Sequence, residues 1–144
     1  MKYQYVCAAL MMSLSGVSIA AVNESCPGSI DIQHTAGIFT APTASGKGEW
    51  VGVLSTPDPK PIKRFEMATV YSGKNESNGT FGKCAYMTEG GERIDLRYRP
   101  GESSEIAVQL ENTSAWKRTE GPFGVVIYQC DSPEKNACAF SELK

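Results

Sequence analysis

The chain has 144 residues, and 14 Lys and Arg face 16 Asp and Glu, which gives a formal net charge of −2 at pH 7. A mildly acidic chain without a long run of like charges binds the phosphate backbone poorly, so we expect no nucleic-acid partner. The length corresponds to about one domain.

The N-terminus is typical of a secretory signal peptide. Lys2 supplies a short positive start, an apolar run follows over residues 6–22, and the run ends in the small residues Ala20 and Ala21. It lacks the roughly 20 strongly apolar residues of a membrane-spanning helix. We therefore expect cleavage after Ala20 or Ala21, a periplasmic or secreted location, and no stable membrane anchor.

The expected signal occupies residues 1–20, and residues 21–144 are expected to form a single all-β domain. Short β-favouring runs separated by Gly, Pro and Asn clusters fill this part, and no window shows helical periodicity. The sequence predicts a mostly antiparallel β-sandwich or flattened barrel of about eight or nine strands. The predicted strands cover residues 29–34, 37–41, 49–54, 62–71, 80–88, 93–99, 105–110, 125–130 and 137–141.

The clearest strand alternation lies in residues 93–99. Ile94, Leu96 and Tyr98 alternate with charged residues, which places one face in a core and the other in water. The turn-rich segment 100–104 resembles a hairpin turn before the next alternating run. The stretch 80–110 is therefore predicted to be an antiparallel meander.

Four of the five cysteines follow the expected signal: Cys26, Cys84, Cys130 and Cys138. An even number in an exported chain indicates two disulfides, although four cysteines allow three pairings. Cys130 and Cys138 flank a turn-rich segment, so the favoured pairs are Cys130–Cys138 and Cys26–Cys84.

Catalytic chemistry has little support in the sequence. His34 is the single histidine, so any histidine-dependent triad or general base must use it, and no serine lies in a nucleophile-elbow pattern. Zinc sites need three or four thiolate or imidazole ligands, which disulfide-bonded cysteines and one histidine do not provide. We expect a structural role for His34, no enzyme activity and no cofactor. A small secreted hydrolase that uses His34 or a carboxylate pair ranks third among the possible functions, after the two binding functions given below.

Two features suggest a binding surface. Trp116 lies between two predicted strands and is expected to be the more exposed of the two tryptophans, where it could stack on a sugar ring. Arg93, Arg97 and Arg99 form a positive stripe that could meet an acidic partner. Core packing of Trp116 and an ordinary charged outer face are the interpretations that the sequence favours.

Six short motifs together resemble the domain-of-unknown-function family 3757, small exported proteobacterial proteins. The resemblance spans essentially all of residues 21–144 and implies a bacterial, periplasmic or secreted protein, but it implies no activity or catalytic residues. The motifs are Cys26-Pro27, Gly48–Leu54, Cys84–Tyr86, Asp95–Tyr98, Pro122–Val125 and Cys138–Ser141.

The function that these observations favour is binding. The leading hypothesis is an exported protein whose partner is another exported or extracellular protein, with an inhibitor or immunity factor against a secreted enzyme as one form of it. A carbohydrate-binding module is the alternative, and it requires exposed aromatic residues such as Trp116.

Overall fold

The computed structural model describes residues 23–73 and 76–143, so the predicted signal and its cleavage site lie outside the described residues. None of the helical segments in these two ranges is long and apolar enough to cross a membrane. The structure is built from strands and three short 3₁₀ turns, η1 (Ser29–Asp31), η2 (Thr113–Ala115) and η3 (Pro122–Gly124). The strands are β1 (Glu24–Ser25), β2 (Gln33–Thr35), β3 (Ile38–Pro42), β4 (Glu49–Val53), β5 (Ile62–Ser72), β6 (Asn78–Thr88), β7 (Arg93–Arg99), β8 (Ala107–Leu110), β9 (Lys117–Glu120), β10 (Val126–Cys130) and β11 (Ala139–Glu142).

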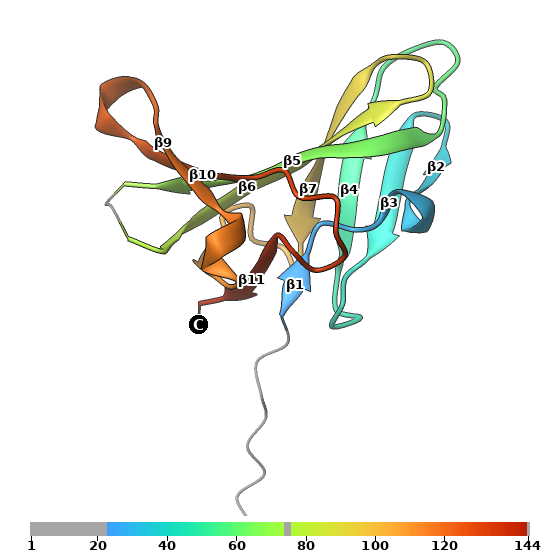
Figure 1. Cartoon of the computed structure of the whole chain (residues 1–144). Helices are drawn as coiled ribbons and strands as arrows, with labels where there is room; N and C mark the ends of the chain where they lie inside the picture. Colours follow the sequence, from blue (N-terminus) through green and yellow to red (C-terminus); the bar gives the residue numbers. More distant parts are fainter. Residues whose placement is uncertain (1–22, 74–75, 144) are drawn as a thin grey trace, which may run out of the picture.

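These strands form one curled antiparallel sheet centred on the long β5–β6 hairpin (Figure 1). The other edge of β5 pairs with β10, and β10 pairs in turn with β9. The second edge of β6 is divided: Asn78–Thr80 pairs with β8, whereas Cys84–Met87 pairs with β7. From there β8 leads to β11 and β1, and β7 leads to β4, β3 and β2.

An aromatic cluster fills the space between the two halves of this curled sheet. Trp50 from β4 contacts Tyr98 of β7 with ring centroids 5.1 Å apart and Phe140 of β11 at 6.2 Å. Phe81 and Phe140 are closer still, at 4.5 Å. In the strand order, β4 and β11 lie on opposite sides of β6. These contacts therefore bring the two halves of the sheet together around one core. The predicted all-β, sandwich-like fold is confirmed.

The predicted disulfide pairing is also confirmed. Cys26 pairs with Cys84, which joins the N-terminal segment to β6 with 5.8 Å between the Cα atoms. Cys130 pairs with Cys138 and joins the end of β10 to the residue before β11, with 5.6 Å between the Cα atoms.

The predicted meander over residues 80–110 is only half right. The β6–β7 hairpin forms, but β8 does not pair with β7. At Arg97 strand β7 begins to pair with β4, where Val51 is opposite Arg97. The first residues of β6 are then left without β7, and β8 pairs with them. The segment 100–104 is therefore a connection between two parts of the sheet and not a hairpin turn.

Candidate functional site

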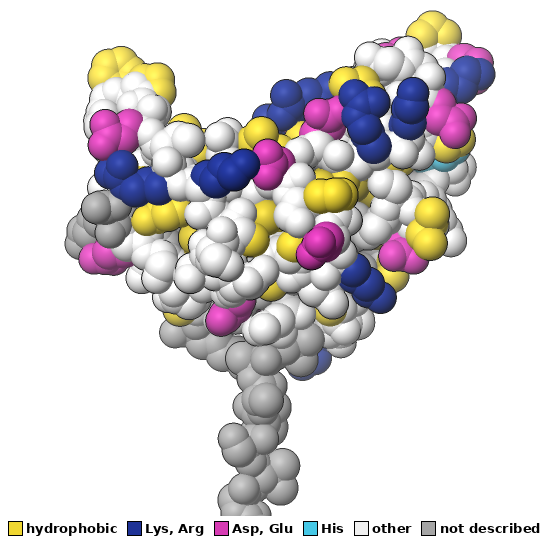
Figure 2. Space-filling model, in the orientation of Figure 1, with side chains coloured by type: hydrophobic (Ala, Val, Ile, Leu, Met, Phe, Trp, Pro, Cys, Tyr) yellow, Lys and Arg dark blue, Asp and Glu magenta, His cyan; other side chains and the backbone are white. Residues whose placement is uncertain are grey.

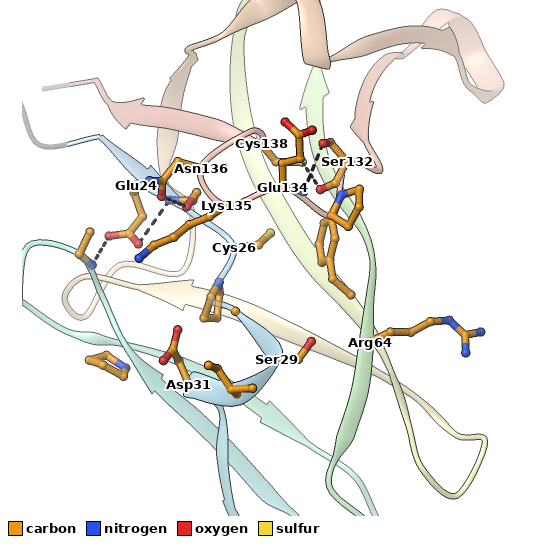
Figure 3. Close-up of a pocket in the computed structure, with 18 of the residues that line it drawn as sticks. Glu24, Cys26, Ser29, Asp31, Arg64, Ser132, Glu134, Lys135, Asn136 and Cys138 are labelled. Atoms are coloured by element: carbon orange, nitrogen blue, oxygen red, sulfur yellow. Dashed lines mark hydrogen bonds between the residues drawn. The ribbon is translucent and has the colours of Figure 1, made fainter.

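A pocket of about 1080 Å³ opens beside the N-terminal segment (Figure 3). Its walls are the segment from Glu24 to Asp31, the stretch from Pro42 to Ala44 at the end of β3, the start of β5, and the loop from Ser132 to Asn136. Each disulfide contributes one cysteine to this lining, Cys26 and Cys138. The two disulfides therefore tether the N-terminal segment and the end of the loop that precedes β11.

The charges around the pocket are of both signs. Asp31 and Lys135 point into the pocket, while Arg64 points away from it (Figure 3). Arg64 Nε lies 2.9 Å from Glu66 Oε1 in an ion pair at the rim. Within the described ranges, no group of three or more His, Cys, Asp and Glu side chains is placed to hold a metal ion. The lining favours neither anions nor cations as a whole.

Glu24 is the most deeply buried charged residue of the pocket, at 5% exposure. Its Oε2 accepts a hydrogen bond from the Ala44 backbone N–H at 2.8 Å, and its Oε1 accepts one from Trp50 Nε1 at 3.3 Å. Burial raises the pKa of this carboxyl, and the hydrogen bonds oppose part of that rise. Because both oxygens are engaged, Glu24 ties β1 to the β3–β4 loop and has a structural role.

Glu24 makes the stability of the protein depend on pH. A pKa raised by folding means that the folded chain binds this proton more readily than the unfolded chain. The contribution of Glu24 to the free energy of unfolding is therefore complete below pH 4.5 and is lost as the pH rises through the raised pKa. We expect Glu24→Gln to gain in stability relative to the unmodified chain as the pH rises from below 4.5 through the raised pKa of Glu24.

Urea unfolding at several pH values measures this difference. Glu102→Gln, at an exposed loop position, serves as the control for loss of one carboxylate. A constant difference between Glu24→Gln and the unmodified chain over this range would contradict the assignment.

The second feature is a projecting hairpin, formed by β9, η3 and β10 and called the arm below. It extends away from the body of the molecule, and hydrophobic side chains lie at its tip (Figures 1 and 2). Phe123 in the tip is fully exposed, and its backbone is left-handed, with φ 60° and ψ 27°. Pro122 and Gly124, with φ 74°, flank it. A left-handed conformation is unfavourable for a bulky L-residue, and such strained positions cluster at functional sites.

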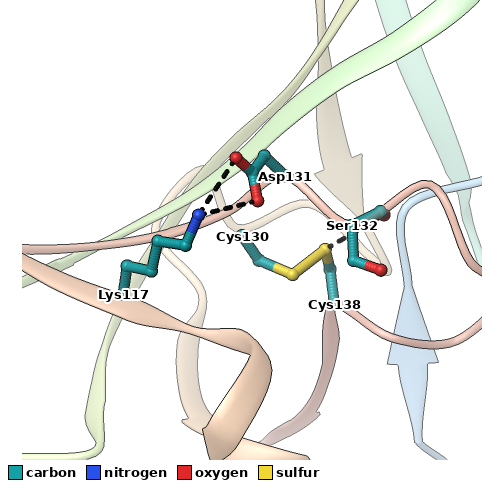
Figure 4. Close-up of polar contacts among 5 residues, drawn as sticks. All are labelled: Lys117, Cys130, Asp131, Ser132 and Cys138. Carbon is teal, nitrogen blue, oxygen red and sulfur yellow. Dashed lines mark hydrogen bonds and ion pairs between the residues drawn. A yellow bond between two sulfur atoms is a disulfide. The ribbon is translucent and has the colours of Figure 1, made fainter.

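Exposed ion pairs lie along β9 of the arm. Lys117 Nζ lies 3.2 Å from Asp131 Oδ2, beside the Cys130–Cys138 disulfide (Figure 4). Arg118 pairs with Glu120 on the same strand, also at 3.2 Å. All four residues of β9 are exposed, and β9 pairs only with β10 among the described strands. A short, charged edge strand resists pairing with another sheet, so the arm presents its tip and not its edge.

The predicted arginine stripe lies on the outer face of β7, where Arg93, Arg97 and Arg99 occupy alternate exposed positions. Its members differ in their partners. Arg93 Nε lies 3.7 Å from Asp95 Oδ1, and Lys83 Nζ lies 2.7 Å from Asp95 Oδ2. Arg97 instead donates from Nη1 to the carbonyl oxygen of Gly82 at 2.6 Å. Arg93 therefore has a carboxylate partner, whereas Arg97 donates to a backbone carbonyl.

Trp116 packs in the core, which is the interpretation that the sequence favours. Trp116 is buried, with 6% of its surface exposed. Its indole N–H lies 3.1 Å from the carbonyl oxygen of Glu111 and 3.2 Å from that of Ala139. The η2 turn brings the ring onto the core, where both carbonyls satisfy the N–H, so Trp116 offers no platform for a sugar ring.

His34 is half-buried and stacks on Phe39, with ring centroids 5.1 Å apart. It is not among the residues that line the large pocket. Sequence reasoning missed Phe123, although Gly121, Pro122 and Gly124 around it are turn residues that could have indicated an exposed aromatic tip.

Comparison with known proteins gives a family and no activity. No curated protein and no solved structure matches the chain. The model of the family described as "Protein of unknown function (DUF3757)" matches residues 21–141, which confirms the resemblance seen in the sequence motifs. The chain therefore belongs to the DUF3757 family.

Proposed function

We propose that this protein is exported and acts by binding another exported protein, with the tip of the arm as its principal contact. The observation that supports this is Phe123: a fully exposed aromatic side chain at the end of a projecting hairpin, in a left-handed conformation. Aromatic residues are enriched where proteins bind one another. Burying a Phe side chain in a partner contributes about 1.5–3 kcal/mol of hydrophobic stabilisation.

The local backbone supports a role outside folding. A glycine would adopt the conformation of Phe123 at lower cost, and an exposed ring gains no packing within the chain that offsets this cost. A narrow tip fits a concave receptor surface better than it fits a flat receptor surface. An inhibitor or immunity factor that places Phe123 in the cleft of a secreted enzyme is therefore the form of binding that we favour.

Export and the absence of catalysis belong to the same proposal. Two disulfides stabilise a chain in an oxidising compartment such as the periplasm or the extracellular medium. Both oxygens of Glu24 accept hydrogen bonds within the chain, and His34 stacks on Phe39 outside the large pocket, which supports binding over catalysis.

Replacing Phe123 with glycine is expected to leave the free energy of unfolding unchanged or to raise it by up to about 1 kcal/mol. The substitution removes an unfavourable backbone conformation and loses no buried contact. Chemical denaturation measures the change. Phe140→Ala, at a fully buried phenylalanine, is the matched control and should cost about 3–5 kcal/mol. A large loss of stability in Phe123→Gly would show that the ring packs within the chain.

Affinity capture tests the function. The chain from residue 21 is immobilised and exposed to periplasmic and culture-medium fractions of its source organism. We expect one protein to be retained in stoichiometric amount by the unmodified chain and by Phe123→Tyr, and to be lost with Phe123→Ser. Equal retention by Phe123→Ser would exclude the arm as the contact, and recovery of glycans alone would favour the carbohydrate-binding alternative.

A further inference from the structure

We propose that the Tyr71 ring and the Arg97 guanidinium form a second contact area for the same partner, and that this area receives a carboxylate-bearing protein segment. The inference rests on the proposed function and adds the chemistry of the partner: an acidic surface next to the apolar pocket that takes Phe123.

A β-bulge at Gly82 builds this area. In the β5–β6 pair, Thr69 is opposite Lys83 and Val70 is opposite Phe81, so Gly82 is an extra residue on β6. A Cβ atom on Gly82 would lie 2.5 Å from Tyr71 Cε2, which places the tyrosine ring directly on the glycine backbone.

Arg97 reaches the same glycine from β7. Its Nη1 donates to the Gly82 carbonyl oxygen at 2.6 Å, which holds the guanidinium beside the backbone that Tyr71 covers. Tyr71 is 41% exposed, and Arg97 is also exposed. The two side chains therefore present an aromatic face and a guanidinium to solvent around one residue.

The charge pattern selects an anionic ligand. Asp95 pairs with both Lys83 and Arg93, at 2.7 and 3.7 Å, so each of these two cations has a carboxylate beside it. No carboxylate of the described residues lies within 4.0 Å of the Arg97 guanidinium. An arginine has five N–H donors in a planar fork, and one bond to a carbonyl leaves donors for a carboxylate.

This area is continuous with the arm. Tyr71 is opposite Ile127 in the β5–β10 pair, so the two side chains share the outer face. A Cβ atom on Gly121 would lie 2.8 Å from Ile127 Cδ1. The Ile127 side chain therefore connects the Tyr71 area with the turn that carries Phe123. The surface thus changes from apolar at the tip to cationic at Arg97. Figure 2 shows a hollow between the arm and the opposite end of the molecule, with Lys and Arg side chains along it.

Nuclear magnetic resonance with a defined peptide tests the site. The probe is the capped peptide acetyl-Glu-Leu-Glu-amide, added to the isotope-labelled chain at low salt, and acetyl-Lys-Leu-Lys-amide is the charge-reversed control. We expect the acidic peptide to shift the side-chain Nε–H signal of Arg97 and the ring signals of Tyr71. We expect Arg97→Gln to weaken its binding by about fivefold or more, since charge-assisted hydrogen bonds are lost.

Matched variants separate this site from general attraction and from the arm. Arg93→Gln removes one charge from the same strand where Asp95 already pairs with it, so it should change the affinity by less than about twofold. Phe123→Ser should leave peptide binding unchanged, so the site and the arm can fail independently. Equal effects of Arg93→Gln and Arg97→Gln, equal shifts with the basic peptide, or shifts only with an acidic oligosaccharide would overturn the inference. Unchanged thermal unfolding of each variant shows that it is folded.

Discussion

Replacing Cys26 and Cys84 together with alanine is expected to lower the free energy of unfolding by about 4 kcal/mol. This disulfide closes a loop of 58 residues in sequence separation, and cross-linking a long loop restricts the unfolded chain strongly. The bridge also joins the N-terminal segment to β6 in the core. Urea or guanidinium unfolding of the double variant measures the loss.

The second disulfide provides the matched comparison. Cys130 and Cys138 are separated by only 8 residues, so replacing both with alanine should cost about 2.6 kcal/mol. The order of the two losses is the sharper test. A larger loss for the short loop would show that the bridges act mainly through the folded state.

Trp50→Ala is expected to cost about 3–5 kcal/mol of stability, because it leaves a large cavity at the centre of the core. Trp50 is fully buried and contacts rings from β6, β7 and β11. Its loss also removes the indole donor to Glu24 Oε1, a hydrogen bond that links β1 to β4. Chemical denaturation measures the effect.

Phe123→Ala is the control for Trp50→Ala, because it also removes an aromatic ring but at a fully exposed position. It should change the free energy of unfolding by no more than about 0.5 kcal/mol. If Trp50→Ala were as mild as this control, the aromatic cluster would not be the contact that holds the two halves of the sheet together.

Much of the fold could be predicted because buried strands leave a pattern in the sequence. Ile94, Leu96 and Tyr98 are all buried, as their alternation with charged residues indicates. Strand β9 (Lys117–Glu120) was missed because all its residues are exposed, so no apolar alternation marks it. The two residues of β1 are too few to show a pattern. Strand β6 pairs with β8 at its start and with β7 further along. The point at which the partner changes depends on strand register, which local sequence patterns do not encode.

The candidate site was less predictable. Trp116 lies outside a regular strand, so no alternation of apolar and polar residues marks its burial, and the carbonyls of Glu111 and Ala139 accept from its indole N–H inside the core. The role of Gly82 follows from a bulge in the β5–β6 pair. A bulge depends on how two strands pair, and the sequence around Arg97 on β7 does not reveal it. Phe123 was missed because exposure of an aromatic residue depends on where the hairpin projects.

Site-specific photocrosslinking at position 123 tests the central claim most directly. Phe123 is replaced by p-benzoylphenylalanine in the full-length gene, the cells are irradiated, and the products are separated and identified by mass spectrometry. We expect one dominant adduct to an exported protein, and no such adduct when the same group replaces Lys47, an exposed residue between β3 and β4. Failure to form an adduct at 123, or the same adduct from both positions, would contradict binding through the tip of the arm.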